Sequence, residues 1–255
     1  MISRVELIGA DTWKIVEGDG PKAVYSYLLK GSDSALLIDT GYGTIPLDEI
    51  VHDLIGDKRK LYVVLTHGHV DHIGATGQFQ QVCMDTDDRD TYIAHAAKDF
   101  RKIFLGEEQL IKEPADVGSI MDIEEIFSPE LDLGGRQVSL MKTPGHSLGC
   151  ICLYDLNNKW LFTGDMCCKA DVLLNMGFAS SIEEYQKSIE KILSVDFEIS
   201  WPGHHEAPVY RETIEQFDEA AQLYLDGRLT GEIVEHPAGN AKRVAYKDIA
   251  IMMEA

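Results

Sequence analysis

Short apolar runs that end at glycine, proline or aspartate recur through both halves of the chain. Runs of this kind, rich in β-branched and aromatic residues, are typical of β-strands. Two of them, "ALLI" and "LYVVL", are apolar without interruption, which indicates strands covered on both faces. We therefore expect strands within residues 23–31, 34–41, 60–68, 91–95, 137–145, 150–156, 159–165 and 198–203.

Segments with apolar residues three and four positions apart alternate with these runs and predict helices. In 180–194 the apolar positions form one stripe, and Ser181 with Glu184 supplies a capping box at its start. A longer helix is expected between Pro208 and Gly227, and others after Ile45, after His95 and from Tyr246 onward. With no linker or repeat in between, we predict one α/β domain over 1–255, with 208–255 a helical C-terminal extension packed on it.

The composition and net charge restrict the kinds of binding partner, but they say little about the fold. Acidic residues outnumber basic ones 43 to 23, giving a formal charge of -20, which repels nucleic acid and anionic membranes. There is no export signal at the start and no apolar run approaching ~18 residues, and the five cysteines do not suggest a disulfide framework. We expect a cytoplasmic protein that acts on a small molecule, with no nucleic-acid or membrane partner; the oligomeric state is left open.

One turn carries most of the candidate chemistry. The stretch "LTHGHVDHIGA", residues 65–75, places His67, His69, Asp71 and His72 directly after a buried strand. If the chain stays extended, His67 and His69 share one face, and a helix starting near Asp71 turns the other two toward the same space. Imidazole and carboxylate ligands suit a divalent ion such as zinc. Four ligands are too many for one tetrahedral ion in so short a turn, so the cluster predicts two adjacent ions.

Three later residues occupy similar positions at the ends of predicted strands. His146 and His204 each follow a Pro-Gly pair, and Asp165 follows Gly164. Proline fixes φ and glycine permits a sharp turn, so each device can direct a side chain away from the strand end. These residues would complete a dinuclear site with the histidine turn.

The order H-x-H-x-D-H, G-H, G-D and P-G-H resembles the metallo-β-lactamase superfamily, whose fold is a four-layer αββα sandwich. The segment "LLIDTG" (36–41) also matches the Asp-Thr-Gly loop of that family, and the matches run in order from about residue 23 to 206. The resemblance implies one metal on His67, His69 and His146, a second on Asp71, His72 and His204, and Asp165 bridging both.

The resemblance also implies a chemistry. A hydroxide between two ions is a strong nucleophile, because coordination lowers the pKa of water toward ~7. Asp71 would hold it and later pass a proton to the leaving group, and Asp39 would orient metal ligands. We therefore expect a hydrolase of an ester, thioester, lactone or related bond, similar to glyoxalase II and the lactonases. The cofactors would be two divalent ions, with zinc preferred to manganese or iron.

Several residues near the proposed metal ligands have expected roles of their own. His205 is expected to support ligands or lie at the surface, and His95 is not expected to bind metal. Tyr42 and Cys168 are candidates for the substrate pocket; Cys168 stands where lactonases carry a tyrosine, which weakens the lactonase alternative. Cys167 is a further candidate for lining the pocket, with a place in the core as the favoured alternative for both residues, and Cys150 and Cys152 are expected on a strand inside the sandwich. Loops 104–130 and 166–180 and the C-terminal segment are expected to wall the pocket, with Phe104, Leu105, Ile120 and Met121 as possible contacts.

Other activities of the same fold stay open. A persulfide dioxygenase would use a single iron, although its usual signature after the Gly-Asp motif is missing here. A nuclease of the RNase Z type would need a basic surface, which the charge of -20 disfavours. A metal protein without catalysis is a further alternative, disfavoured because every expected ligand is present.

Overall fold

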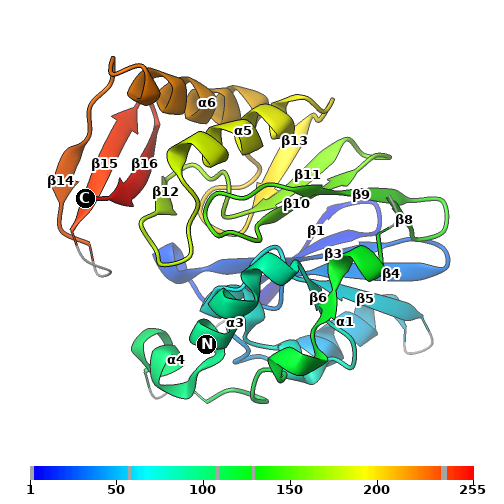
Figure 1. Cartoon of the computed structure of the whole chain (residues 1–255). Coiled ribbons are helices and arrows are strands. Elements are labelled where there is room, and N and C mark those ends of the chain that lie inside the picture. Colours follow the sequence, from blue (N-terminus) through cyan, green and yellow to red (C-terminus); the bar gives the residue numbers. More distant parts are fainter. Residues whose placement is uncertain (1–2, 57–58, 107–108, 128–129, 237–239) are drawn as a thin grey trace. The chain divides into compact units, whose positions relative to one another are not determined.

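The computed structural model describes residues 3–56, 59–106, 109–127, 130–236 and 240–255. The chain forms two compact units. The first comprises Met1–Ser139 and Asp155–Asn157, and the second comprises Leu140–Tyr154 and Asn158–Ala255. In Figure 1 the first unit runs from blue to green and the second from green to red.

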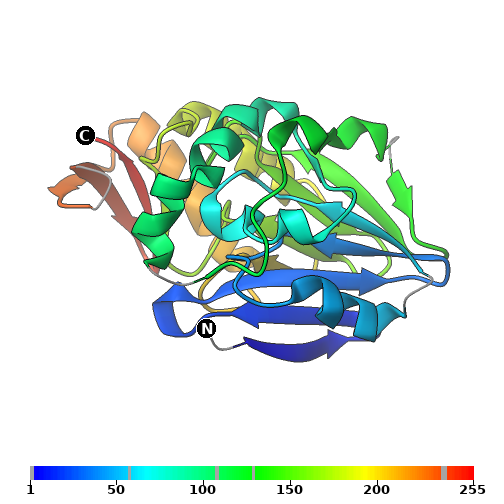
Figure 2. The ribbon, with the colours of Figure 1, turned by 90° about the horizontal axis from the view of Figure 1, so that it is seen from below.

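The first unit is built on a seven-stranded sheet whose strands follow one another in chain order. The first four strands pair antiparallel, and the pairs from β4 to β7 are parallel. Parallel neighbours need crossover connections, and these carry the helices and the histidine turn. The blue and cyan strands of Figure 2 belong to this sheet. Its strands are β1 (Ser3–Gly9), β2 (Thr12–Glu17), β3 (Val24–Lys30), β4 (Ser34–Ile38), β5 (Lys60–Val64), β6 (Cys83–Met84) and β7 (Met121–Asp122).

The first unit has a mainly aliphatic core, to which three of its helices contribute side chains. Every residue of β4 is buried, as its unbroken apolar run predicts, whereas β5 is buried only at Val63 and Val64. Leu47, Val51 and Ile55 form the buried stripe of α1 and join the same core. The helices are α1 (Leu47–Ile55), α2 (Val70–Ile73), α3 (Arg89–Ala96) and α4 (Lys98–Leu105), with 3-10 turns at Gly20–Lys22, Thr76–Gln78, Thr86–Asp88, Val117–Ser119 and Ile123–Glu125.

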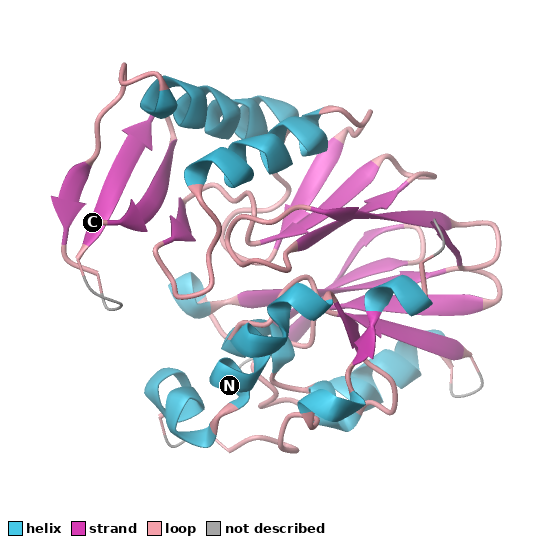
Figure 3. Cartoon of the chain, viewed as in Figure 1, coloured by secondary structure: helices cyan, strands magenta, loops and turns pink. Residues whose placement is uncertain are grey.

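A five-stranded sheet runs in the order β13-β11-β10-β9-β8, and the division between the units falls within β9. A further four-stranded sheet, β12-β16-β15-β14, lies in the second unit with two helices (Figure 3). The elements are β8 (Glu130–Asp132), β9 (Gln137–Lys142), β10 (Ile151–Asp155), β11 (Trp160–Gly164), β12 (Asp171–Leu174), α5 (Ile182–Leu193), β13 (Ile199–Pro202), α6 (Arg211–Leu225), β14 (Glu232–Val234), β15 (Ala241–Tyr246) and β16 (Ile249–Glu254).

Most predicted elements are confirmed. Seven of the eight predicted strand segments hold a strand, in order β3, β4, β5, β9, β10, β11 and β13. The stripe in 180–194 is α5, whose apolar residues join the core of the second unit, and the Ser181 side chain accepts a hydrogen bond from the Glu184 amide at 3.3 Å. The helix predicted to end near Gly227 is α6.

Two predictions were wrong. Residues 91–95 are not a strand but part of α3, because the apolar run is too short to distinguish the two forms and Tyr92 is buried on one face of a helix. No helix begins at Tyr246: Lys247 and Asp248 form a two-residue turn between β15 and β16, and Lys247 has a φ of 48°. Among the described residues of 208–255, which leave out 237–239, helix is confined to α6, and three strands follow it.

In the part of the chain that the structure describes, no helix has the length and apolar character that a membrane crossing requires.

Candidate metal centre

The histidine turn follows β5 and enters α2. His69 is the extended residue before the helix, with φ -73° and ψ 153°, and Asp71 and His72 lie in the single turn that follows. The ring centroid of His67 lies 4.6 Å from that of His69 and 4.1 Å from that of His72. Nε2 of His72 is 3.9 Å from Oδ1 of Asp71. The first unit thus brings these four side chains together from one short stretch of chain.

Asp39 supports the histidine turn through hydrogen bonds to Thr66 and His72. It follows β4 with a φ of 60°, and its Oδ1 accepts a hydrogen bond from the Thr66 amide at 2.7 Å. Its Oδ2 accepts from the Thr66 hydroxyl at 2.8 Å and lies 2.9 Å from Nδ1 of His72. A carboxylate only accepts, so Nδ1 of His72 donates and Nε2 faces the other ligands, the arrangement usual for a metal-bound histidine. Such contacts are what an orienting role requires, and that role of Asp39 stays a prediction.

Asp88 and His95 also position the turn, and the sequence analysis gave neither this role. The buried carboxylate of Asp88 accepts a hydrogen bond from the Gly68 amide. Nδ1 of His95 accepts from the Val70 amide at 3.1 Å, and its ring stacks on His69 with centroids 4.5 Å apart. The only sequence signal for Asp88 was its place directly before a helix, where aspartate is common for capping alone.

Gly68 is required by the packing of α3 against the turn. A Cβ atom at this position would lie 2.7 Å from the Tyr92 amide nitrogen and 3.1 Å from the Asp88 carbonyl oxygen. Both atoms belong to backbone, so neither can rotate away. The absence of a side chain between His67 and His69 therefore allows α3 to come close enough to support the loop.

In the second unit, His146 lies on the loop after β9. Its Nδ1 is 2.6 Å from the carbonyl oxygen of Leu173, which can only accept, so Nδ1 donates and Nε2 is the nitrogen available to a ligand. The preceding Gly145 is confined as well, because a Cβ atom there would lie 2.7 Å from side-chain atoms of Met166 and Tyr185. The Pro-Gly-His turn thus directs His146 by backbone geometry and packing.

Asp165 and His204 complete the set of the second unit. Asp165 follows β11, where Gly164 has a φ of 50°, and His204 follows β13. Oδ2 of Asp165 lies 3.5 Å from Nε2 of His146 and 3.5 Å from Nε2 of His204. Three loops distant in sequence therefore direct two imidazole nitrogens toward one carboxylate.

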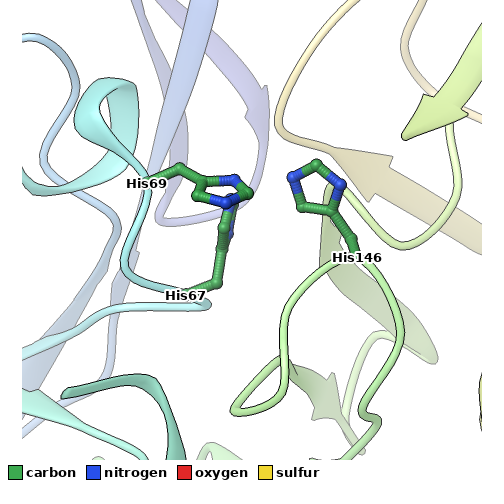
Figure 4. A group of neighbouring side chains, drawn as sticks. All are labelled: His67, His69 and His146. Carbon is green, nitrogen blue, oxygen red and sulfur yellow. The ribbon is translucent and has the colours of Figure 1, made fainter. Parts of the chain in front are cut away.

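The donor set in both units fits a borderline divalent ion. Imidazole Nε2 atoms and carboxylate oxygens are zinc ligands. Nδ1 of His72 donates a hydrogen bond to a carboxylate, and Nδ1 of His146 donates one to a backbone carbonyl. Figure 4 draws three of these side chains, from the loops after β5 and β9. All seven predicted ligands are among the described side chains that could hold a metal ion: His67, His69, Asp71, His72, His146, Asp165 and His204.

The predicted pocket residues have distinct environments. The amide of Tyr42 donates to Oε2 of the buried Glu17 at 2.9 Å, and its side chain is half-buried. Burial raises the pKa of Cys168 well above its ordinary value, which favours the neutral thiol over the reactive thiolate. His205 is exposed with a φ of 65°. Participation of these residues in a substrate pocket stays a prediction.

The other cysteines are core residues, which confirms the prediction for Cys150 and Cys152 and the favoured alternative for Cys167. Cys83, Cys150, Cys152 and Cys167 are buried, and burial raises the pKa of Cys83 and of Cys152 to about 12. Two of the proposed pocket contacts are also enclosed, since Ile120 lies in the core of the first unit and Leu105 is buried. Phe104 is exposed, and Met121 is half-buried in β7.

Comparison with known proteins identifies the family. A sequence model of the metallo-β-lactamase superfamily matches residues 19–204. Acyl-coenzyme A thioesterase MBLAC2 of Homo sapiens is 29% identical over 201 residues, which cover 70% of this chain and 71% of that protein. Atrochrysone carboxyl ACP thioesterase of Aspergillus fumigatus is 28% identical over 184 residues, covering 70% of this chain and 50% of that protein.

A solved structure, the metallo-beta-lactamase from Pontibacter korlensis, has a TM-score of 0.65 at 17% identity and covers 87% of this chain and 99% of its own. At this identity the likeness concerns the fold alone. The match of the family model to most of the chain carries the assignment. The chain belongs to the metallo-β-lactamase superfamily and has the αββα fold of that family.

Proposed function

We propose that the protein is a metal-dependent thioester hydrolase. The observation that carries the proposal is the convergence of histidine and aspartate side chains in each unit, with Nδ1 of His72 and of His146 held by an acceptor. The choice of a thioester rests on the names of two relatives, an acyl-coenzyme A thioesterase and an acyl carrier protein thioesterase. Cys168 in place of the lactonase tyrosine disfavours a lactone.

Seven residues would hold two ions, zinc in preference to manganese or iron. His67, His69 and His146 would bind the first, Asp71, His72 and His204 the second, and Asp165 both. When bound, such ions supply a Lewis acid for the carbonyl oxygen and lower the pKa of water at the site. Asp39, Asp88 and His95 would keep the ligands of the first unit oriented before any ion arrives.

Asp71 is the residue to which we assign proton transfer. Its side chain is 19% exposed and lies in the first turn of α2, so its carboxylate is accessible to water and substrate. Water adds to the thioester carbonyl carbon as Asp71 accepts its proton, the carbon–sulfur bond breaks, and the thiol leaves with that proton. The products are a carboxylic acid and a free thiol.

Metal content and thiol release test the proposal together. Protein purified without added metal should contain about two zinc or manganese ions per chain, and should release thiol from acyl-coenzyme A faster than alcohol from the matched oxygen ester. About one iron per chain, with oxygen uptake on a persulfide, would instead establish a dioxygenase. Absence of metal and of thiol release would refute the proposal.

An isosteric variant separates the proton-transfer role from folding. Asp71→Asn keeps the shape and one ligand oxygen but removes the base, and should lower kcat by about 10²- to 10⁴-fold. His52→Gln is the matched control, a histidine in α1 outside the proposed ligand set, and should leave kcat unchanged.

A further inference from the structure

Helix α4 presents two of its apolar residues to solvent and buries a charge. Ile103 is 76% exposed and Phe104 42% exposed, whereas Arg101 is 6% exposed. The Arg101 guanidinium donates to the Ala96 carbonyl at 2.9 Å and pairs with Glu113. Leu105 is buried, as expected for a surface helix, whereas Ile103 and Phe104 leave an exposed apolar face that a ligand can cover.

The outer face of α4 is connected to the metal ligands by a row of aromatic rings. The ring of His69 stacks on His95 at 4.5 Å, His95 meets Phe100 at 4.2 Å, and Phe100 meets Phe104 at 5.1 Å. Phe100 and Phe104 are four residues apart and share one helix face. Ala97 alone separates α3 from α4, which lets the row continue from one helix to the other (Figure 1). We call His95, Phe100 and Phe104 the aromatic row.

The chemistry of the aromatic row selects the ligand. Phenyl faces offer apolar surface without charge, which favours an alkyl chain over a phosphate or a peptide. His95 is only 5% exposed, so an alkyl chain would lie on Phe100 and Phe104, with its polar head toward His69, the proposed metal ligand on which His95 stacks. An acetyl group at His69 is too short to reach the exposed end.

We propose that the aromatic row is the subsite for the acyl chain of a medium- or long-chain thioester. This inference rests on the proposed function and adds the part of the substrate that is selected. Exposed apolar residues with Lys98 and Lys102 nearby also suit a membrane surface, but a membrane anchor does not require ring contacts leading to His69. The continuity of the row therefore favours the acyl chain.

A chain-length series with Phe104→Ala tests the inference. The variant should lower kcat/KM for dodecanoyl-coenzyme A by about tenfold and for acetyl-coenzyme A by less than about twofold, because only the longer chain reaches this ring. Phe104→Leu should recover most of the loss. Ile111→Ala is the matched control, a 55% exposed apolar residue of the same unit outside the row, and should change neither value. Equal losses on both substrates, or none, would overturn the inference.

Binding keeps this test separate from catalysis. Calorimetric titration with dodecyl-coenzyme A thioether, which cannot be hydrolysed at sulfur, should show weaker affinity for Phe104→Ala than for the unmodified protein. If no thioester is hydrolysed but this difference is found, the proposed reaction fails and the apolar subsite stands. If Phe104→Ala abolishes sedimentation with phosphatidylcholine vesicles and leaves thioether affinity unchanged, the row is a membrane contact and the inference is wrong.

Discussion

The two sets of candidate ligands are held in different ways. In the first unit one loop carries all four, and buried side chains from elsewhere in that unit, Asp39, Asp88 and His95, bond to the loop or its histidines. In the second unit three separate loops carry one ligand each, and Nδ1 of His146 bonds to the Leu173 backbone carbonyl. Supporting side chains can be replaced by mutation, whereas a backbone carbonyl cannot. The first set should therefore be the more sensitive to substitutions outside the ligands.

The largest expected effect comes from the carboxylate on which the second set converges. Asp165→Ala removes the oxygen lying 3.5 Å from Nε2 of both His146 and His204. Thioesterase activity should fall by more than about a hundredfold, the upper loss expected for a merely supporting group, and metal content should fall with it. Elemental analysis and a thiol-release assay measure both. Full metal content in the variant would show that the second set does not bind as assigned.

The next largest effect is expected from removing a side chain that supports the histidine turn of the first unit. Asp88→Ala leaves the Gly68 amide without its carboxylate and should weaken metal affinity by about 10- to 100-fold, measured by competition with a chelating dye. Asp87→Ala, an exposed neighbour, is the control.

In the second unit, Ser188→Ala is the substitution to compare with Asp88→Ala. The Ser188 hydroxyl donates to the Pro144 carbonyl at 2.7 Å, close to His146. Because the Leu173 carbonyl still holds the ring, Ser188→Ala should change metal affinity by less than about tenfold. A loss equal to that of Asp88→Ala would remove the difference between the two sets.

A pH effect on stability is expected from Glu17 in the first unit. Burial raises the pKa of Glu17 above its ordinary value of 4.5, although the Thr44 hydroxyl and three backbone amides donate to it. The folded state thus holds this proton more tightly than the unfolded state, and the resulting stability, complete below pH 4.5, is lost as pH rises through the raised pKa. Urea unfolding from pH 4 to 7 should show a weaker pH dependence in Glu17→Gln; parallel curves would contradict this.

The smallest effect tests the second unit without touching its ligands. Ser181→Ala removes the cap of α5 and should lower the free energy of unfolding by about 1 kcal/mol, measured by denaturant titration. Metal affinity should not change. A variant that loses metal would show that α5 contributes to the ligand loops more directly than its contacts indicate.

The sequence predicted most accurately what depends on neighbouring residues. The stripe of α5 with its cap, the buried β4 and the convergence around His72 all follow from short-range patterns. The supporting role of Asp88 could not be predicted, because it depends on how closely α3 packs against Gly68. The C-terminal strands were missed for a similar reason: the run after Asp248 is buried by pairing with β12 and β15, which no local pattern reveals.

Gly68 has a consequence for how such a loop can change over generations. Any side chain there would collide with the Tyr92 and Asp88 backbone. Substitution of Gly68 is therefore selected against for steric reasons, whether or not the loop binds metal. In a randomised library of residues 66 to 70, we expect glycine at position 68 even among clones selected only for solubility. Packing against α3 would then conserve the glycine between the two histidines. A descendant that no longer binds metal would retain this glycine for the same steric reason.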